Sequence, residues 1–418
     1  MRIAVIGNGI AGINVAASLK TLGGDAVTVV VYSKEIHPFY SRVRLPEVIA
    51  GESTPEDIRF YPEQWYEKKG FTVRLGTEVR SIDRAAKQLI LADGTAEHWD
   101  ALVLATGARS NCPAIPGVDL PGVFTLRTVE DALAIRGSVT ERRSSASVIG
   151  GGLLGLETAR ALTVAGSASV RVFEIFPHLL PRQLDDQCAQ LLSSHLSSLG
   201  IEVVCLANTE AFLPSAQGDG RAASIKLKDG RSFSSDTTIL SMGVTPCTDL
   251  AREAGLTVNR GIVVDDLLRT SDPSIWAVGD CAEFAGIVWG IIPAALEQVP
   301  VAARAILATQ DLLPQEELRH YAQTIPNTTL KITGVDLSSM GKAVLSPDDV
   351  ASGRYQVYQH TSEAGTRYEK FVLENVAGDG LTVCGVILWG SREHLSAAKA
   401  MLGTTANIEE IKKLLEGW

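Results

Sequence analysis

Residues 2–12 read RIAVIGNGIAG, in which a short apolar strand pattern is followed at once by a glycine fingerprint of the form GxGxxG. The helix pattern AGINVAASLK comes next, so the glycines lie at a strand-to-helix turn. Gly7 permits the tight turn, Gly9 lets the backbone approach a pyrophosphate, and Gly12 allows the helix to pack closely. A helix N-terminus also attracts phosphate. The stretch therefore predicts a dinucleotide-binding βαβ unit, and a tight structural turn without a ligand is the alternative. The predicted contacts are Gly7, Gly9, Ile10, Ala11 and Gly12.

The same pattern returns near the middle of the chain. Strand SASVI precedes the fingerprint Gly150-Gly151-Gly152-Leu153-Leu154-Gly155, a helix containing Glu157 follows, and the next strand, SVRVFE, ends on Glu174. Glu174 lies 24 residues after Gly150, close to the spacing at which a carboxylate binds both ribose hydroxyls. This carboxylate would repel a 2′-phosphate, so the sequence predicts NADH in preference to NADPH. Arg182 favours the opposite choice unless it forms an ion pair elsewhere on the surface.

The first unit lacks the corresponding acid at the end of its second strand. The segment TVVVYSKE ends that strand with Tyr32 and Ser33, and its first carboxylate is Glu35. Glu35 either reaches a ribose or is an exposed loop glutamate, and the sequence leaves both readings open.

Composition limits the class of protein. A chain of 418 residues is too long for one hydrophobic core, which predicts two or three domains. A net charge of −10 and a pI near 5.3 argue against general nucleic-acid binding, which needs a basic surface. Glycines interrupt the apolar N-terminal segment, no cleavage site follows it, and no later run reaches about 18 apolar residues. We therefore expect a cytoplasmic protein without a membrane span.

The cysteines form no CxxC pair, so the sequence indicates neither a metal site nor a disulfide framework. We expect each to be a small buried apolar residue in a reducing compartment. They are Cys112, Cys188, Cys205, Cys247, Cys281 and Cys384.

Segments rich in proline and glycine divide the chain. The strand pattern at residues 100–108 is followed by the crossover CPAIPGVDLPG at residues 112–122, and ILSMGVTP at residues 239–246 marks the return, after which short strands follow. From about Tyr321, period-two segments predict an antiparallel sheet, closed by the amphipathic helix IEEIKKLLEGW. The period-two segments are TTLKITGVDL, RYQVYQH, YEKFVLEN and LTVCGVILWG.

These residues resemble the FAD-dependent pyridine nucleotide-disulfide oxidoreductase superfamily, whose members bind FAD at the first fingerprint and NAD(P)H at the second. Three further segments carry the resemblance, which spans roughly residues 1–320: Ala105-Thr106-Gly107, Gly243-Val244-Thr245-Pro246 and TSDPSIWAVGD at residues 270–280. The resemblance implies an α/β fold with two nested Rossmann-like domains of the glutathione-reductase type, followed by a small α+β C-terminal domain. The FAD-binding domain would comprise residues 1–110 and 243–320, the NAD(H)-binding domain residues 111–242, and the third domain residues 321–418.

The resemblance also implies roles for individual residues. Asp280 would bind the flavin ribityl chain, unless it only caps the next turn. The segment Ala294–Gln298, which includes Glu297, would offer backbone donors to the isoalloxazine ring at a helix N-terminus. Arg42 would meet the pyrophosphate. Glu157 would be the catalytic residue near the nicotinamide and flavin N5, unless it is a helix residue buried against the sheet. The expected cofactor contacts are Gly7, Gly9, Ile10, Ala11, Gly12, Glu35, Arg42, Ala105, Thr106, Gly107, Asp280, Glu297, Gly150, Gly152, Leu153, Leu154, Gly155, Glu174 and Gly243.

The absence of cysteines near the N-terminal end of the chain excludes several branches of the superfamily. Its disulfide reductases need a cysteine pair beside the flavin, and its NADH peroxidases and coenzyme A disulfide reductases need one cysteine near position 42, whereas this chain has none before Cys112. The segment PFYSRVRLPE at residues 38–47 instead resembles the NADH:rubredoxin reductase branch and the flavin module of NADH-dependent nitrite reductase, as does NTTLKITGVD at residues 327–336. Monooxygenase-type ferredoxin reductases carry lysine in place of Glu47, so the flavin electronics would differ.

Hydride transfer from nicotinamide C4 to flavin N5 needs no side-chain nucleophile, because the cofactors carry the chemistry. The electrons would then pass to an external acceptor, which by resemblance is a small iron protein of the rubredoxin or ferredoxin type. A basic patch of Arg42, Arg44 and Arg59 is a candidate docking surface, and scattered solvated arginines are the alternative. The rival functions are an NADH oxidase, a nitrite-reductase-like flavin subunit and an NADH-sensing flavoprotein similar to apoptosis-inducing factor. The sequence leaves the oligomeric state open.

Overall fold

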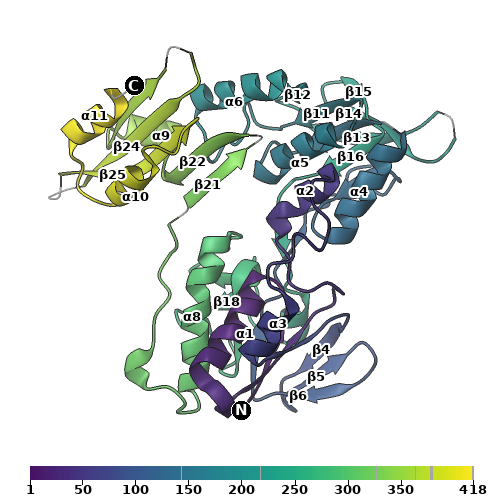
Figure 1. The fold of residues 1–418 in the computed structure, drawn as a ribbon, viewed down its shortest axis with the longest axis vertical. Helices are drawn as coiled ribbons and strands as arrows, with labels where there is room; N and C mark the ends of the chain where they lie inside the picture. Colours follow the sequence, from purple (N-terminus) through teal and green to yellow (C-terminus); the bar gives the residue numbers. More distant parts are fainter. Residues whose placement is uncertain are drawn as a thin grey trace. The chain divides into compact units, whose positions relative to one another are not determined.

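The computed structural model describes residues 1–142, 144–216, 218–325, 327–332, 334–362, 364–376 and 380–416. Its contacts divide the chain into two compact units (Figure 1). Unit 1 comprises Met1–Arg42, Thr54–Arg109 and Val244–Thr324. Unit 2 comprises Val43–Ser53, Ser110–Gly243 and Ile325–Trp418.

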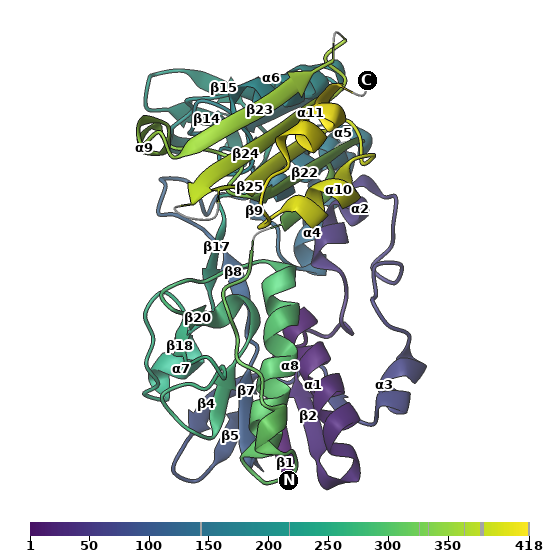
Figure 2. The same ribbon diagram turned by 90° about the vertical axis from the view of Figure 1, so that its left-hand side faces the viewer.

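Unit 1 is built on a five-stranded parallel sheet with the order β19-β7-β1-β2-β3. The strands are β1 (Arg2–Ile6), β2 (Thr28–Tyr32), β3 (Thr72–Arg74), β7 (Ala101–Leu104) and β19 (Ile275–Ala277). All four residues of β7 are buried, as expected for a parallel strand that is covered on both faces. Helices α1 (Ile10–Gly23) and α8 (Ile292–Ala308) pack side by side, as Figure 2 shows.

Smaller elements complete unit 1. A three-stranded antiparallel sheet, which the sequence did not lead us to expect, is inserted between β3 and β7 and consists of β4 (Val79–Asp83), β5 (Gln88–Leu91) and β6 (Ala96–His98). β18 (Ile262–Val264) pairs with β20 (Ala282–Phe284), and β8 (Ala108–Ser110) pairs with β17 (Val244–Pro246). The remaining helices are α3 (Glu63–Lys69) and α7 (Asp249–Glu253).

Unit 2 contains a second five-stranded parallel sheet, with the order β12-β11-β10-β16-β9. Its strands are β9 (Val123–Thr125), β10 (Ser145–Ile149), β11 (Ser169–Phe173), β12 (Ile201–Val204) and β16 (Thr237–Leu240). The helices are α4 (Val129–Arg142), α5 (Leu153–Val164) and α6 (Asp186–Ser198). A second antiparallel insertion, also unexpected, is formed by β13 (Thr209–Pro214), β14 (Ala222–Leu227) and β15 (Ser232–Ser234). Helix α2 (Leu45–Ala50) packs against α4 and α5, although residues 43–53 had been expected in the first domain.

The C-terminal part of unit 2 is an antiparallel sheet with the order β21-β22-β25-β24-β23. Its strands are β21 (Asn327–Ile332), β22 (Val335–Gly341), β23 (Tyr355–Thr361), β24 (Tyr368–Val376) and β25 (Gly380–Trp389). The helices are α9 (Pro347–Ala351), α10 (Leu395–Met401) and α11 (Ile408–Glu416). The segment TTLKITGVDL is two strands rather than one, because the chain turns at Gly334, whose φ is +98°. Thr333, Gly417 and Trp418 lie outside the described residues.

The α/β class is confirmed, with two Rossmann-like parallel sheets and an α+β C-terminal part. The assignment of the three predicted domains to FAD, NAD(H) and a third role stays a prediction. Among the described residues, no helix has both the length and the apolar character that a membrane span requires.

Candidate functional site

The first fingerprint forms a tight turn at the carboxyl end of β1. Gly7 has a φ of +117°, and a Cβ placed there would lie 2.1 Å from the carbonyl oxygen of Ala105. A Cβ at Gly12 would lie 1.9 Å from the carbonyl oxygen of Gly7. A Cβ at Gly9 would meet no protein atom within 4 Å. Gly7 and Gly12 are therefore required by the fold itself, whereas the space at Gly9 is open to a ligand.

Polar groups at this turn lack protein partners. Helix α1 starts directly after Gly9, which provides no side-chain cap for the first-turn N–H groups. Within the described part of the chain, the buried Oδ1 atom of Asn8 has no hydrogen-bond partner. Because buried polar atoms are normally satisfied, these groups fit a bound polar ligand such as a pyrophosphate.

The structure brings Glu35 and Arg42 together. Nη2 of Arg42 donates to Oε1 of Glu35 at 2.5 Å, and the Tyr40 hydroxyl donates to Oε2 of Glu35 at 2.6 Å. Burial acts to lower the pKa of Arg42, but surrounding groups raise it above its ordinary value. Those groups are Tyr40, Glu35 and Asp280. Glu35 is thus an ion-pair partner of Arg42 rather than a freely exposed loop glutamate, and Arg42 also lies within electrostatic reach of Asp280.

The other predicted residues of unit 1 lie at the ends of neighbouring strands. Ala105, Thr106 and Gly107 follow β7, and Gly279 and Asp280 follow β19. In an open parallel sheet, ligands bind outside these carboxyl ends where the strand order reverses, which here is between β1 and β7.

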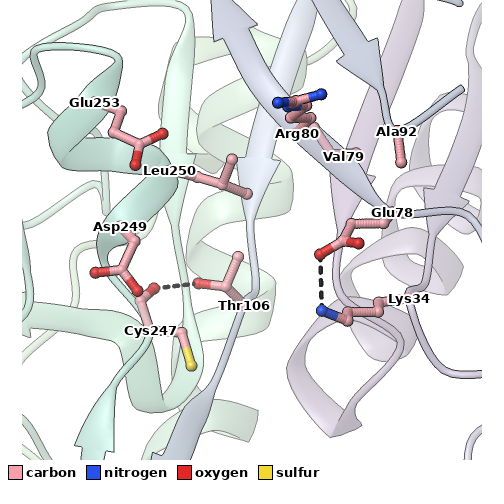
Figure 3. Close-up of a pocket in the computed structure, with 10 residues that line it drawn as sticks. All are labelled: Lys34, Glu78, Val79, Arg80, Ala92, Thr106, Cys247, Asp249, Leu250 and Glu253. Atoms are coloured by element: carbon pink, nitrogen blue, oxygen red, sulfur yellow. Dashed lines mark hydrogen bonds and ion pairs between the residues drawn. The ribbon is translucent and has the colours of Figure 1, made fainter. Parts of the chain in front are cut away.

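A cavity of about 580 Å³ opens at this end of the sheet in unit 1 (Figure 3). Nζ of Lys34 donates to Glu78 at 2.8 Å on one side of it, and the Thr106 hydroxyl donates to the carbonyl oxygen of Cys247 at 2.7 Å on the other. Of these residues, the sequence predicted only Thr106 as a cofactor contact. Lys34 comes just after the end of the second strand, where a ribose-binding acid was expected. This position in the sequence could have identified Lys34 as a candidate site residue. The lining residues are Lys34, Glu78, Val79, Arg80, Ala92, Thr106, Cys247, Asp249, Leu250 and Glu253.

Helix α8 begins close to Asp280 in sequence and packs against the turn that carries it. Oε1 of Gln298 accepts a hydrogen bond from the Gly279 N–H at 2.7 Å. Glu297 accepts from the Thr324 hydroxyl at 2.6 Å. Because α8 starts at Ile292, Glu297 lies in its second turn, where backbone N–H groups are used within the helix. The open backbone donors therefore belong to the first turn, which includes Ala294.

The second fingerprint repeats the geometry of the first in unit 2. Gly150 has a φ of +116°, and its Cβ would lie 2.2 Å from the Ser241 carbonyl oxygen. A Cβ at Gly155 would lie 2.1 Å from the carbonyl oxygen of Gly150, and one at Gly152 would meet no protein atom within 4 Å. Leu153 and Leu154 open helix α5.

Glu174 follows β11 and is buried, with 6% of its surface exposed. Oε2 accepts from the Gly151 N–H at 2.7 Å, and Oε1 accepts from the Phe176 N–H at 3.0 Å. Each oxygen keeps a further lone pair for a ribose hydroxyl. Gly243 follows β16 with a φ of +85°, and Arg182 is exposed in the loop after Glu174.

Glu157 is partly exposed on α5 rather than buried against the sheet. Its charge helps to raise the pKa of Arg160, although the larger cause is the hydrogen bonding of Arg160 to Glu52 at 2.8 Å. Glu52 follows α2, so this ion pair joins residues 43–53 to α5 within unit 2.

The predicted basic patch is not a cluster of unpaired cations. Arg42 pairs with Glu35, Arg44 with Glu47, and Arg59 with Glu56. The expectation that every cysteine is buried is confirmed only for Cys188 and Cys281. It was wrong for Cys112, which is exposed, and the remaining three cysteines are only partly buried. In the residues that the structure describes, no cluster of histidine, cysteine and carboxylate side chains is arranged to hold a metal ion.

Comparison with known proteins finds similarity along the whole chain. The family model for pyridine nucleotide-disulphide oxidoreductases matches residues 1–305. The NAD(P)H nitrite reductase of Bacillus subtilis (strain 168) is 31% identical over 413 residues, which cover 99% of this chain and 48% of the relative. A rubredoxin-NAD(+) reductase of Pseudomonas putida is 31% identical over 348 residues, covering 82% of this chain and 86% of the relative. The crystal structure of NADH:rubredoxin oxidoreductase from Clostridium acetobutylicum has a TM-score of 0.75 at 27% identity, covering 100% of this chain and 99% of that one. The chain spans about half the length of the nitrite reductase.

Proposed function

The chain belongs to the pyridine nucleotide-disulphide oxidoreductase family, a family of FAD- and NADH-dependent reductases, and from this premise we propose that it passes electrons from NADH through FAD to a separate acceptor. The observation that carries the proposal is the duplicated fingerprint. Gly7, Gly9 and Gly12 have the same backbone environments as Gly150, Gly152 and Gly155, each set at the end of a central parallel strand. Two such turns provide one dinucleotide site in each unit.

The residues of unit 1 fit FAD. When bound, FAD supplies a ring that accepts two electrons from a reduced nicotinamide and releases them one at a time. The N-terminus of α1 and the Arg42 guanidinium hold the pyrophosphate, since both present positive charge and N–H donors. The cavity beside Thr106 takes the adenosine end. Asp280 accepts a ribityl hydroxyl, and the first turn of α8 stabilises negative charge on the ring.

The residues of unit 2 fit NADH. The N-terminus of α5 holds the pyrophosphate, and Glu174 accepts hydrogen bonds from the ribose hydroxyls. The same carboxylate disfavours a 2′-phosphate, which supports NADH over NADPH. Glu157 is the residue of unit 2 that we assign to the reacting end of the nucleotide.

We infer that the electron acceptor is not a thiol of this chain. No cysteine occurs among residues 1–111, and the buried Cys281 thiol donates to the Leu104 carbonyl oxygen while burial raises its pKa. A thiol of this kind is a poor nucleophile, so Cys281 is not suited to store an electron pair from the flavin. We propose a rubredoxin or similar small iron protein as the acceptor, which the rubredoxin reductases among the relatives support.

A second candidate is the flavin module of a nitrite-reducing system. It is favoured by the nitrite reductase of Bacillus subtilis, because the alignment covers 99% of this chain but only 48% of that protein. In this case the electrons would go to a further domain or chain that reduces nitrite.

Stopped-flow spectroscopy of the FAD-loaded protein tests these proposals. NADH should bleach the flavin absorbance in the first mixing step, and a second mixing step with rubredoxin or ferredoxin should restore it much faster than quinone or dioxygen does. If NADH leaves the flavin absorbance unchanged, the proposed function is wrong.

The second mixing step also separates the rival functions. Fast reoxidation by dioxygen alone indicates an NADH oxidase, and fast reoxidation only by a nitrite-reducing partner indicates the nitrite-reductase module. Slow reoxidation with every acceptor, together with NADH-dependent dimerisation in light scattering, indicates an NADH sensor.

A further inference from the structure

We propose that the C-terminal part of the chain shapes the NADH site, because a buried ion pair between Lys370 and Asp185 fixes the loop that follows Glu174. The proposal rests on the proposed function, since it presupposes that NADH binds at the second fingerprint. Lys370 is then a positioning residue that acts through the loop and does not touch the nucleotide.

The loop of residues 175–185 connects the ribose-binding acid to helix α6. At its start, Ile175 and Phe176 are more than half exposed, with 54% and 53% of their surfaces accessible. In its middle, Leu180 has a φ of +51°, a conformation that costs energy for a residue with a side chain. The Leu180 N–H donates to the Gly151 carbonyl oxygen at 3.2 Å, so the loop lies directly on the fingerprint. The buried side chains of Leu179, Leu180 and Leu184 anchor the middle of the loop. Its end at Asp185 is held by further contacts.

Those contacts come from the C-terminal sheet. Nζ of Lys370 donates to Oδ2 of Asp185 at 2.8 Å, and the Tyr368 hydroxyl donates to the same oxygen at 2.5 Å. The Lys370 side chain is only 8% exposed. The Ser339 hydroxyl donates to the carbonyl oxygen of Gln183 at 2.8 Å. Two strands, β22 and β24, therefore hold the end of the loop.

Burial along β24 shows that this face of the sheet is covered. Residues 368–373 are all buried, although a strand with one solvent-facing side alternates between buried and exposed residues. Phe371 and Leu373 pack in the apolar core formed with α10 and α11. Tyr368 and Lys370 point to the opposite face, where Asp185 is their partner. The ion pair thus joins the C-terminal sheet to the nucleotide-binding part of unit 2.

Asp185 is also the N-cap residue of helix α6. Its Oδ1 accepts from the Cys188 N–H at 3.0 Å and so caps helix α6. Burial acts to raise the pKa of Asp185, but the hydrogen bonds from Lys370 and Tyr368 lower it below its ordinary value. Loss of Lys370 would leave a partly buried carboxylate without its cation, and the loop end would move toward water. The loop beyond Glu174, which includes the exposed Arg182, would then change its position, whereas Glu174 itself stays bound to the Gly151 N–H.

Lys370→Met in the FAD-loaded protein tests the proposal. We expect the Kd for NADH to rise about 5- to 30-fold, with a smaller preference for NADH over NADPH, while the FAD content stays unchanged. Burial raises the pKa of the Cys188 thiol. This thiol should react faster with iodoacetamide in the variant, because Asp185, which caps helix α6 at the Cys188 N–H, is no longer held in place. Lys370→Arg retains the cation and should restore most of the affinity.

Lys342→Met is the control for the loss of a lysine–aspartate pair, because the hydrogen-bond partners of Lys342 are Asp349 and Tyr355, neither of which is on the loop. It should leave the Kd for NADH and the reactivity of Cys188 unchanged. If Lys370→Met behaves like this control, the proposal is overturned. If Lys370→Met does not fold, Ser339→Ala decides: a raised Kd for NADH supports the proposal and an unchanged Kd overturns it. Failure of the unmodified protein to bind NADH would instead contradict the proposed function.

Discussion

The Glu174 carboxylate accepts a hydrogen bond at 2.7 Å from the backbone N–H of Gly151, so the acid at the end of β11 is tied to the fingerprint at the end of β10. The two parts of the proposed nucleotide site, one for the ribose and one for the pyrophosphate, are thereby held together by the protein itself. A preorganised site of this kind loses less entropy on binding.

Glu174→Gln should weaken NADH binding and narrow the discrimination against NADPH. Glutamine has one acceptor oxygen in place of two and carries no charge. We expect kcat/KM for NADH to fall by about 10-fold or more, since hydrogen bonds to charged groups contribute roughly 1.5–3 kcal/mol. Relative activity with NADPH should rise, as measured by steady-state kinetics with both nucleotides.

Glu202→Gln is the control for this prediction, because Glu202 is an exposed glutamate on the adjacent strand and pairs with Arg171. Equal effects of the two substitutions would show that Glu174 has no special role.

Gly9→Ala and Gly152→Ala should separate cofactor binding from folding. Both glycines have negative φ values, −89° and −81°, and open space around the missing Cβ, so alanine fits the protein without its ligands. We expect the Tm of the apoprotein to stay the same or rise slightly, because alanine restricts the unfolded chain. Gly9→Ala should lower FAD affinity by at least about 10-fold, since one misplaced methyl at a tight phosphate contact costs more than about 1.4 kcal/mol.

Gly152→Ala should affect NADH affinity and spare FAD. Titration of each apoprotein with FAD and of each holoprotein with NADH measures this. A substitution that weakened both cofactors equally would contradict the assignment of one fingerprint to each.

Arg42→Met should lower FAD affinity, because it removes the cation that we assign to the pyrophosphate and that is paired with Glu35. We expect the Kd for FAD to rise roughly 10- to 100-fold, in line with a charge-assisted hydrogen bond. Arg59→Met is the matched control, since Arg59 is also ion-paired in unit 1 but with the exposed Glu56. FAD affinity that is the same in both variants would argue against the placement of the pyrophosphate.

Alkylation at pH 8 should distinguish the cysteines. Cys112 is exposed and should react first, whereas Cys188 and Cys281 are buried and should remain protected. Burial raises the pKa of Cys384 from 9.0 to about 11. Because the thiolate is the reactive form, its rate at pH 8 should be roughly 100-fold lower than that of an ordinary thiol and should increase as the pH rises toward 11. Mass spectrometry of timed samples measures this, and protein unfolded in denaturant should react at all six positions. Early labelling of Cys188 in the folded protein would contradict the described fold.

The sequence alone was sufficient to predict those features whose residues lie close together in the chain. The two fingerprints, their flanking strands and helices, and the position of Glu174 all follow from glycine backbone freedom and from the fixed spacing within a βαβ unit. The lack of cysteine before Cys112 likewise needed no structure. Together these features determined the α/β class and predicted two dinucleotide sites.

Only the tertiary structure decided the features that join distant residues. It paired Glu35 with Arg42, placed Lys34 and Glu78 at a cavity with Thr106, and added an antiparallel insertion to each unit. It also joined Asp185 to Lys370, which are 185 positions apart. These contacts could not be predicted because the spacing of hydrophobic residues shows which face of a helix or strand is buried. It does not show which other element packs against that face. The partner is set by strand order and chain crossings, which are decided when the complete chain packs.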